Sequence, residues 1–136
     1  YAWVERTWKN GDTIEIALEM PVERIEAHPS VREDCGMIAL QRGPVVYCLE
    51  EYDNGADLAD LSLPDTARLE VKPGRIAGTP ARLIEGEGHR RDRRGWAGKL
   101  YRADPSPLRK VRIRAVPYFM WNNRGDGGEM RVWIRR

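Results

Sequence analysis

The residues best suited to binding a ligand gather near the C-terminal end of the chain. Aromatic rings stack on sugar rings, and amide and guanidinium groups form hydrogen bonds with hydroxyls. The candidate substrate-binding residues are therefore Trp121, Asn122, Asn123, Arg124 and Trp133. The alternative is structural: both Trp side chains pack in the core, while the amides and Arg124 satisfy the loop backbone and Glu129.

No catalytic or metal-binding residue is predicted. Cys35 and Cys48 lack the spacing of a zinc site, and His28 and His89 lie far apart in the sequence. Cys48 lies within an apolar run, where a free thiol usually serves as a small buried hydrophobe. Adjacent carboxylates on a strand point to opposite faces, so they cannot act together on one bond.

Length and composition predict one globular domain, residues 1–136, with no membrane span and no nucleic-acid partner. The 136 residues are 32% charged and 41% hydrophobic, and no apolar run approaches the ~20 residues that a membrane helix needs. Residues 1–67 hold 5 basic and 14 acidic side chains, a net charge of −9, whereas residues 68–136 hold 18 and 7, a net charge of +11. Pairing between the two halves explains this split better than a basic face would.

The first twenty residues predict a β-hairpin. Asn10 and Gly11 are the pair that tight hairpin turns favour, because both central residues need positive φ. In the second arm Ile14, Ile16 and Leu18 alternate with polar residues, a period of two that indicates one buried and one exposed face.

About nine short segments of the chain are strand candidates, including a pair joined by a turn at Gly43 and Pro44. They predict an all-β fold, an antiparallel β-sandwich of jelly-roll type, and leave open that it is truncated at its N-terminal edge. The charged run 89–95 is expected to form a solvated loop. The alternating faces predict a core of Ile14, Ile16, Leu18, Leu40, Val46, Cys48, Val111, Ile113, Val132 and Ile134.

The segment 122–128 predicts a tight turn. Gly125 and Gly128 permit positive φ, and Asn123 tolerates it better than most residues. Arg124, held in such a turn, is expected to act as a clamp on Glu129 or on a carboxylate of the acidic half. Trp121 and Trp133 are then expected on neighbouring strands.

Three blocks of sequence carry a resemblance to a known family. The first has Trp8 before Gly11-Asp12, the second is Gln-Arg-Gly-Pro at 41–44, and the third is Asn-Arg-Gly at 123–125 followed by Gly-Glu-Met at 128–130. In this order they resemble the C-terminal part of the glycoside hydrolase family 127 proteins, the β-L-arabinofuranosidase-like family once filed as domain of unknown function 1680. Residues 53–108 carry little of the pattern.

The resemblance implies a longer parent hydrolase with a catalytic (α/α) barrel, followed by β-sandwich structure to which this chain belongs. It also implies that a cysteine nucleophile, a glutamate acid/base and a zinc ion lie in that barrel, so no catalytic residue and no cofactor is carried over to this chain. Because preceding strands of the sandwich are missing, the exposed edge favours pairing with a second copy.

Two functions remain open at this stage. The first is a non-catalytic domain that braces the parent's barrel, and the second is a carbohydrate-binding module that presents arabinose-containing glycans. Burial of the Trp121 and Trp133 indoles would favour bracing, and an exposed indole would favour binding. We expect a soluble protein of the cytoplasm, although no motif gives the location.

Overall fold

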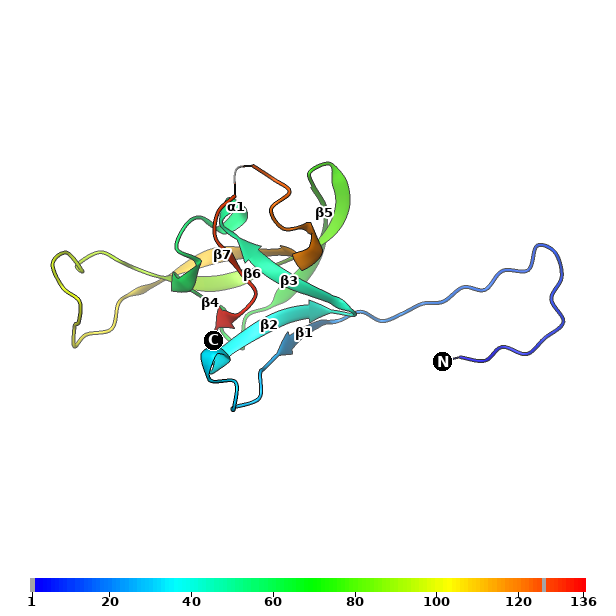
Figure 1. The fold of residues 1–136 in the computed structure, drawn as a ribbon, viewed down its shortest axis with the longest axis horizontal. Coiled ribbons are helices and arrows are strands. Elements are labelled where there is room, and N and C mark those ends of the chain that lie inside the picture. Colours follow the sequence, from blue (N-terminus) through cyan, green and yellow to red (C-terminus); the bar gives the residue numbers. More distant parts are fainter. Residues whose placement is uncertain (1, 126) are drawn as a thin grey trace.

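The computed structural model describes residues 2–125 and 127–136, and it consists mostly of strands, which confirms the all-β prediction (Figure 1). The one α-helix in these ranges is a single turn, α1 (Glu51–Asn54), and 3-10 turns cover Arg32–Asp34 (η1), Leu58–Asp60 (η2) and Tyr118–Met120 (η3). None of these helices is long and apolar enough to cross a membrane. The strands are β1 (Val22–Ile25), β2 (Met37–Arg42), β3 (Val45–Glu50), β4 (Leu61–Ser62), β5 (Leu69–Ile76), β6 (Thr79–Arg91), β7 (Leu108–Pro117), β8 (Met130–Arg131) and β9 (Ile134–Arg135).

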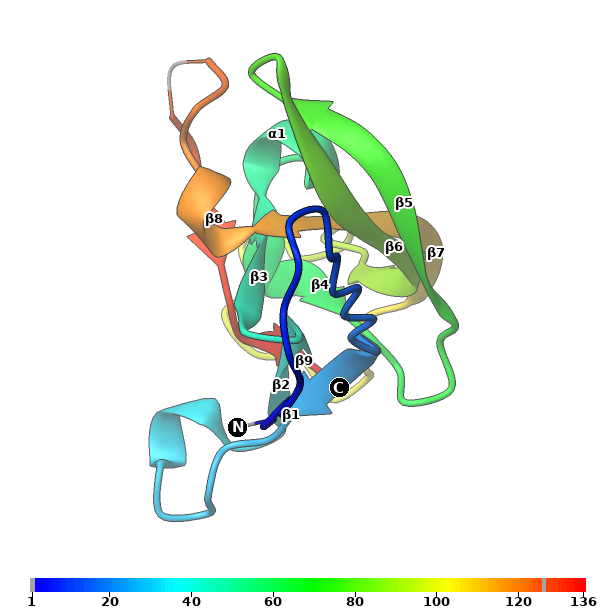
Figure 2. The same cartoon turned by 90° about the vertical axis from the view of Figure 1, so that its right-hand side faces the viewer.

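The strand pairings form one mixed, largely antiparallel sheet that folds back on itself. Strands β5, β6 and β7 lie side by side, as Figure 2 shows, and β7 pairs with β3, which forms a hairpin with β2. The C-terminal segment contributes β8 alongside β3 and β9 alongside β2. Because β9 also pairs with β4, and β4 pairs with β6, the pairings return to their starting strand. The last strand thus closes the sheet.

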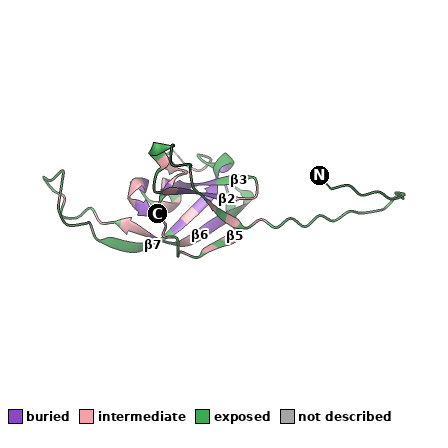
Figure 3. Ribbon diagram, turned by 90° about the horizontal axis from the view of Figure 1, so that it is seen from below, coloured by how far each residue is buried: buried purple, intermediate pink, exposed green. Residues whose placement is uncertain are grey.

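The core lies between the β2–β3 hairpin and the β6–β7 pair, the two-layered arrangement of a β-sandwich (Figure 3). On β7, Ile113 is buried while Arg112 and Arg114 lie on the other face, because successive strand residues point to opposite sides. The largest side chains with less than 2% exposure come from both layers and from the connection between β3 and β5. They are Ile38, Leu40, Leu49, Leu58, Leu61, Leu63, Ile76, Ile84 and Val116.

The predicted core is confirmed within the sheet, with one exception. Leu40, Cys48, Ile113 and Ile134 are buried, and Val111 and Val132 are partly buried and pack against the core. Val46 is 38% exposed, so its prediction is wrong. Its side chain points to the face of β3 opposite Val45 and Tyr47, which both pack in the main core. The predicted turn at Gly43 and Pro44 is confirmed, with Gly43 at φ +55°.

The predicted N-terminal hairpin is wrong as a pair of strands. Residues 2–20 form an extended arm that projects from the body and contains no strand (Figure 1). Only its turn is present: the amide of Asp12 donates to the carbonyl of Lys9 at 3.1 Å, with Gly11 at φ +93°. An isolated two-stranded hairpin is marginal in water, so without a sheet to join, the pairing does not form.

As a result, the apolar face of the arm is open to solvent. Ile14, Ile16 and Leu18 are 52%, 75% and 76% exposed, so their assignment to the core is wrong. The charged run 89–95 also differs from expectation at its start. Strand β6 continues through Arg91, because Arg90 and Arg91 pair with Arg109 and Leu108 of β7.

We expect Ile113→Ala to lower the free energy of unfolding by about 2–5 kcal/mol, the usual effect of emptying a buried aliphatic site. The matched control Ile16→Ala changes the same side chain in the exposed arm and is expected to shift the free energy by less than about 0.5 kcal/mol. Urea unfolding of the three proteins measures both values. Equal shifts for the two variants would contradict the assignment of the core.

Candidate functional site

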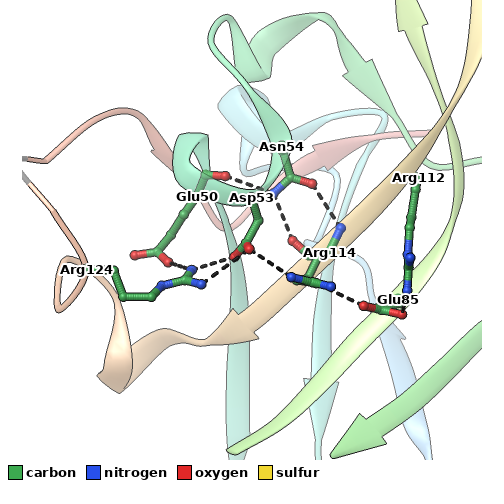
Figure 4. A network of polar contacts seen from close by, with 7 residues as sticks. All are labelled: Glu50, Asp53, Asn54, Glu85, Arg112, Arg114 and Arg124. Carbon is green, nitrogen blue, oxygen red and sulfur yellow. Dashed lines mark hydrogen bonds and ion pairs between the residues drawn. The ribbon is translucent and has the colours of Figure 1, made fainter. Parts of the chain in front are cut away.

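Arg124 is clamped by two carboxylates, Glu50 at the end of strand β3 and Asp53 in helix α1. Its Nη2 pairs with Glu50 and lies 2.5 Å from Oδ2 of Asp53, and its Nη1 lies 3.3 Å from Oδ1 of Asp53 (Figure 4). The three side chains are nearly buried, with 12%, 8% and 4% of their surfaces exposed. The predicted clamp on a carboxylate of the acidic half is therefore confirmed.

The ion pairs continue from Asp53 across the sheet. Oδ1 of Asp53 lies 3.2 Å from Nη1 of Arg114, and Nε of Arg114 donates to Glu85 at 2.9 Å. Glu85 also accepts from Arg112. Charges of opposite sign thus alternate from Arg124 to Arg112, so each buried carboxylate has a cationic partner (Figure 4).

The local structure explains why these side chains meet. Helix α1 starts immediately after Glu50, so Asp53 lies three residues further on, on the same face of the helical turn. Strand β3 pairs with β7, which brings the backbone of Arg114 beside Asn54. The Asn54 amide donates to the carbonyl of Arg114 at 2.8 Å and accepts from its N–H at 2.9 Å. Arg114 in turn lies directly opposite Glu85 on β6.

Pairing controls the ionisation of Glu85, a residue with 5% exposure. The hydrogen bond from Arg112, together with those from Arg114 and Lys72, lowers the pKa of its carboxyl to about 2 despite the opposing effect of burial. The carboxylate is therefore charged at every physiological pH. A buried charge of this kind is stable only while its partners stay in place.

Ion pairs between the two halves of the chain confirm their predicted complementarity. Among the described residues, each such pair joins an arginine of the basic half to a carboxylate of the acidic half. The arginines are Arg93, Arg114, Arg124 and Arg136, and the carboxylates are Glu26, Glu50, Asp53, Asp57, Asp60 and Asp65.

The turn that holds Arg124 differs in detail from the prediction. Gly125 and Gly128 have positive φ, at +78° and +137°, but the asparagine in the left-handed region is Asn122, not Asn123. Glu129 does not receive Arg124 as its partner. Its carboxylate accepts instead from the amide of Leu58 at 2.6 Å. Asp126, within this predicted turn, lies outside the described residues.

The two tryptophans do not share neighbouring strands as expected. Trp121 follows η3, whereas Trp133 lies between β8 and β9 and is partly buried. Trp121 is 36% exposed, and the neighbouring Asn122 and Asn123 are exposed as well. Sugar binding by these residues stays a prediction.

Beside Arg124 the surface has only a small hollow. Trp121, Asn122 and Tyr52 are among its lining residues, and its volume is ≈ 10 Å³. That is about the space that one water molecule needs, so this hollow cannot enclose a sugar ring. One face of the Tyr52 ring is also occupied, because the Arg124 guanidinium lies 4.5 Å from its centroid.

Neither cysteine has the setting of an activated nucleophile. Cys48 is fully buried, and burial raises the pKa of its thiol to about 12, so the thiol stays protonated at neutral pH. Cys35 is exposed and its Sγ is 3.8 Å from the carbonyl oxygens of Pro29 and Val31. Residues 2–125 and 127–136 contain no group of three or more His, Cys, Asp or Glu that could hold a metal ion.

Sequence reasoning found Arg124 but missed Glu50, Asp53, Glu85 and Arg114. One available signal was the acidic run that directly follows the apolar strand VVYCL, since carboxylates so close to a core need cationic partners. Glu85 on β6 gave no such signal, because its contact with Arg114 depends on how β3, β7 and β6 pair.

Comparison with known proteins gives a consistent picture. The model of the glycoside hydrolase family 127 C-terminal domain matches residues 22–135. The non-reducing end β-L-arabinofuranosidase of Bifidobacterium longum subsp. longum is 35% identical over 133 residues, which cover 93% of this chain and 20% of the relative. The chain thus spans about a fifth of the length of this curated relative.

Solved structures share the fold. A glycoside hydrolase family 127 β-L-arabinofuranosidase from Geobacillus stearothermophilus T6 is 50% identical, with a TM-score of 0.80 over 85% of this chain and 18% of that chain. A second solved glycoside hydrolase is 39% identical, with a TM-score of 0.83 over 97% of this chain and 22% of that chain. The resemblance noted in the sequence is confirmed.

We expect Arg124→Lys to lower the free energy of unfolding by about 1–3 kcal/mol, because an ammonium cannot reproduce the forked contact with two buried carboxylates. The control Arg94→Lys removes a similar fork on Asp92, but this arginine is 91% exposed, so the change should have a much smaller effect. Urea unfolding compares the two variants. If Arg124→Lys were as stable as Arg94→Lys, the clamp would not be structural.

Proposed function

The chain belongs to glycoside hydrolase family 127 as its C-terminal domain, and from this we propose that it is a non-catalytic β-sandwich that braces the catalytic domain of a longer β-L-arabinofuranosidase-like hydrolase. One observation carries the bracing role. The charged side chains around Arg124, which suit a sugar by type, are nearly buried and bind one another.

The chemistry in this proposal takes place elsewhere in the parent polypeptide. The nucleophilic cysteine, the glutamate acid/base and the zinc ion that the resemblance implies belong to its (α/α) barrel. The protonated thiol of Cys48 supports this division of roles, because a cysteine nucleophile reacts as the thiolate. The catalytic barrel is thus the proposed partner of this domain.

A carbohydrate-binding module is the second candidate function. It is favoured by the 36% exposure of Trp121 beside two exposed asparagine amides. A sugar at this position would lie on the open surface of the indole, because the neighbouring hollow holds about one water. A second copy of the chain is a further candidate partner, since the apolar face of the arm, Ile14 to Leu18, is exposed.

The bracing role predicts that the full-length hydrolase loses activity when this domain unfolds. We expect Ile113→Ala in the full-length enzyme to lower the midpoint temperature of thermal inactivation by several degrees, with kcat/KM at 25 °C unchanged. Val46→Ala, a change at a partly exposed apolar site, is the control and should leave the midpoint near that of the wild type. An unchanged midpoint for Ile113→Ala, in a domain shown to melt earlier, would contradict bracing.

The two functions also predict different responses to sugar. Under bracing, arabinose and arabino-oligosaccharides shift the melting temperature of this chain no more than glucose oligomers do at the same concentration. Under the binding-module alternative, the melting temperature rises saturably by mass action, and Trp121→Ala removes the rise without unfolding the domain. Differential scanning fluorimetry with glucose oligomers as the control ligand decides between these outcomes.

A further inference from the structure

A long loop between β6 and β7 projects from the body of the domain. Residues 92–107 form this loop, which we call the projecting loop, and it lies at the end of the molecule opposite the N-terminal arm (Figure 1). The amide of Asp92 donates to the carbonyl of Pro107 at 2.8 Å and closes its base. Of the solvated run predicted at 89–95, only residues 92–95 belong to this loop.

The projecting loop has a defined shape although it contains no strand or helix. The indole N–H of Trp96 donates to the Ser106 hydroxyl at 2.9 Å and so ties the two sides together. The Arg102 guanidinium lies over the same indole, 5.6 Å from its ring. The amide of Lys99 donates to the carbonyl of Trp96 at 2.9 Å and forms a turn. Such a loop loses little further conformational freedom when it binds a partner.

The loop displays two large apolar side chains next to each other. Leu100 and Tyr101 are 87% and 89% exposed, whereas Trp96 in the same loop is partly covered. A preorganised loop that holds adjacent apolar side chains in solvent is typical of a contact surface for another protein. The aliphatic Leu100 fits a protein hollow better than a sugar, because it has no flat face for stacking.

The surroundings of these two side chains are strongly basic. Residues 90–112 contain 9 basic and 2 acidic side chains, a net charge of +7. Several of the basic ones pair within the domain, as Arg93 does with Asp57 and Asp60. Lys99, Arg102 and Arg109 take part in none of the ion pairs among residues 2–125 and 127–136. A complementary partner surface has an apolar hollow with a rim of carboxylates.

The length of the relatives points to one partner. This chain matches only 20% of the curated relative and 18% and 22% of the two solved hydrolases, so most of each relative lies outside the matched domain. A partner in the same polypeptide meets the loop at an effective concentration in the mM range, which allows a contact of two side chains to form. A separate protein would lack this advantage.

We infer that Leu100 and Tyr101 dock into an acidic-rimmed apolar hollow on the catalytic part of the parent hydrolase. The inference rests on the proposed bracing function and names the surface through which the domain would brace the enzyme. The projecting loop then acts as a rigid peg whose apolar tip is buried only in the full-length protein.

Cysteine labelling tests the contact directly. Tyr101→Cys is made in a Cys35→Ser background, both in this chain and in the full-length hydrolase, and its reaction with a maleimide is followed by peptide mass spectrometry. We expect the rate to fall by about an order of magnitude or more in the full-length protein, because a covered thiol is inaccessible. Thr79→Cys, at an exposed position at the start of β6 and so at the opposite end of this strand from the loop, is the control and should react equally in both proteins.

Equal labelling of Tyr101→Cys in the two proteins would overturn the inference. Protection that disappears on dilution would also overturn it, because the covering surface would then be a second copy. If the Ile113→Ala enzyme is inactivated early but the tip stays reactive, bracing stands and occurs through another surface.

A charge at the tip gives an independent measurement. Leu100→Asp should leave the melting temperature of this chain unchanged, since the side chain is already in solvent. In the full-length hydrolase Leu100→Asp should lower the midpoint of thermal inactivation. A carboxylate is disfavoured in an apolar hollow, and the carboxylates at the rim would also repel it. The same midpoint as the wild type would contradict the docking.

Discussion

The pairing of buried charge beside helix α1 is the constraint on which the C-terminal part of the fold depends. Glu50 is the last residue of β3 and Asp53 lies in α1, and a carboxylate removed from water needs a cation with good geometry. Arg124 supplies that cation from a turn 71 residues beyond Asp53. The turn leads into β8, which pairs with β3, and then into β9, which pairs with β2 and β4. Satisfying two carboxylates thereby helps to fix the path of the strand that closes the sheet.

Local sequence patterns predicted the parts of the fold that local chemistry determines. The alternation around Ile113 and the glycine turn at Gly43 gave a correct face and a correct hairpin, because each depends on a few neighbouring residues. The network around Arg124 was predicted only in outline. The charge split between the halves implied partners, but choosing Asp53 over Glu129 required the register of strands far apart in the sequence.

In the N-terminal arm the local pattern predicted the wrong structure. The period of two at Ile14, Ile16 and Leu18 indicates that one face is covered, yet it does not say by what. Within residues 2–125 and 127–136 no strand pairs with the arm, and its apolar face is exposed. The family model begins at residue 22, so the arm lies outside the part of the chain that the model matches.

A structural site and a binding site can contain the same residue types, and what separates them is whether the side chains are buried and already paired. The arginine, carboxylates and aromatic rings around Arg124 have the composition of a sugar site. The charged groups among them are nearly buried and already paired, so a ligand hydroxyl would have to displace a stronger ionic contact. At the projecting loop the balance is reversed, since Lys99 and Tyr101 carry their charge and apolar surface in solvent. Burial and pairing, rather than residue type, therefore locate the surface that is free to meet a partner.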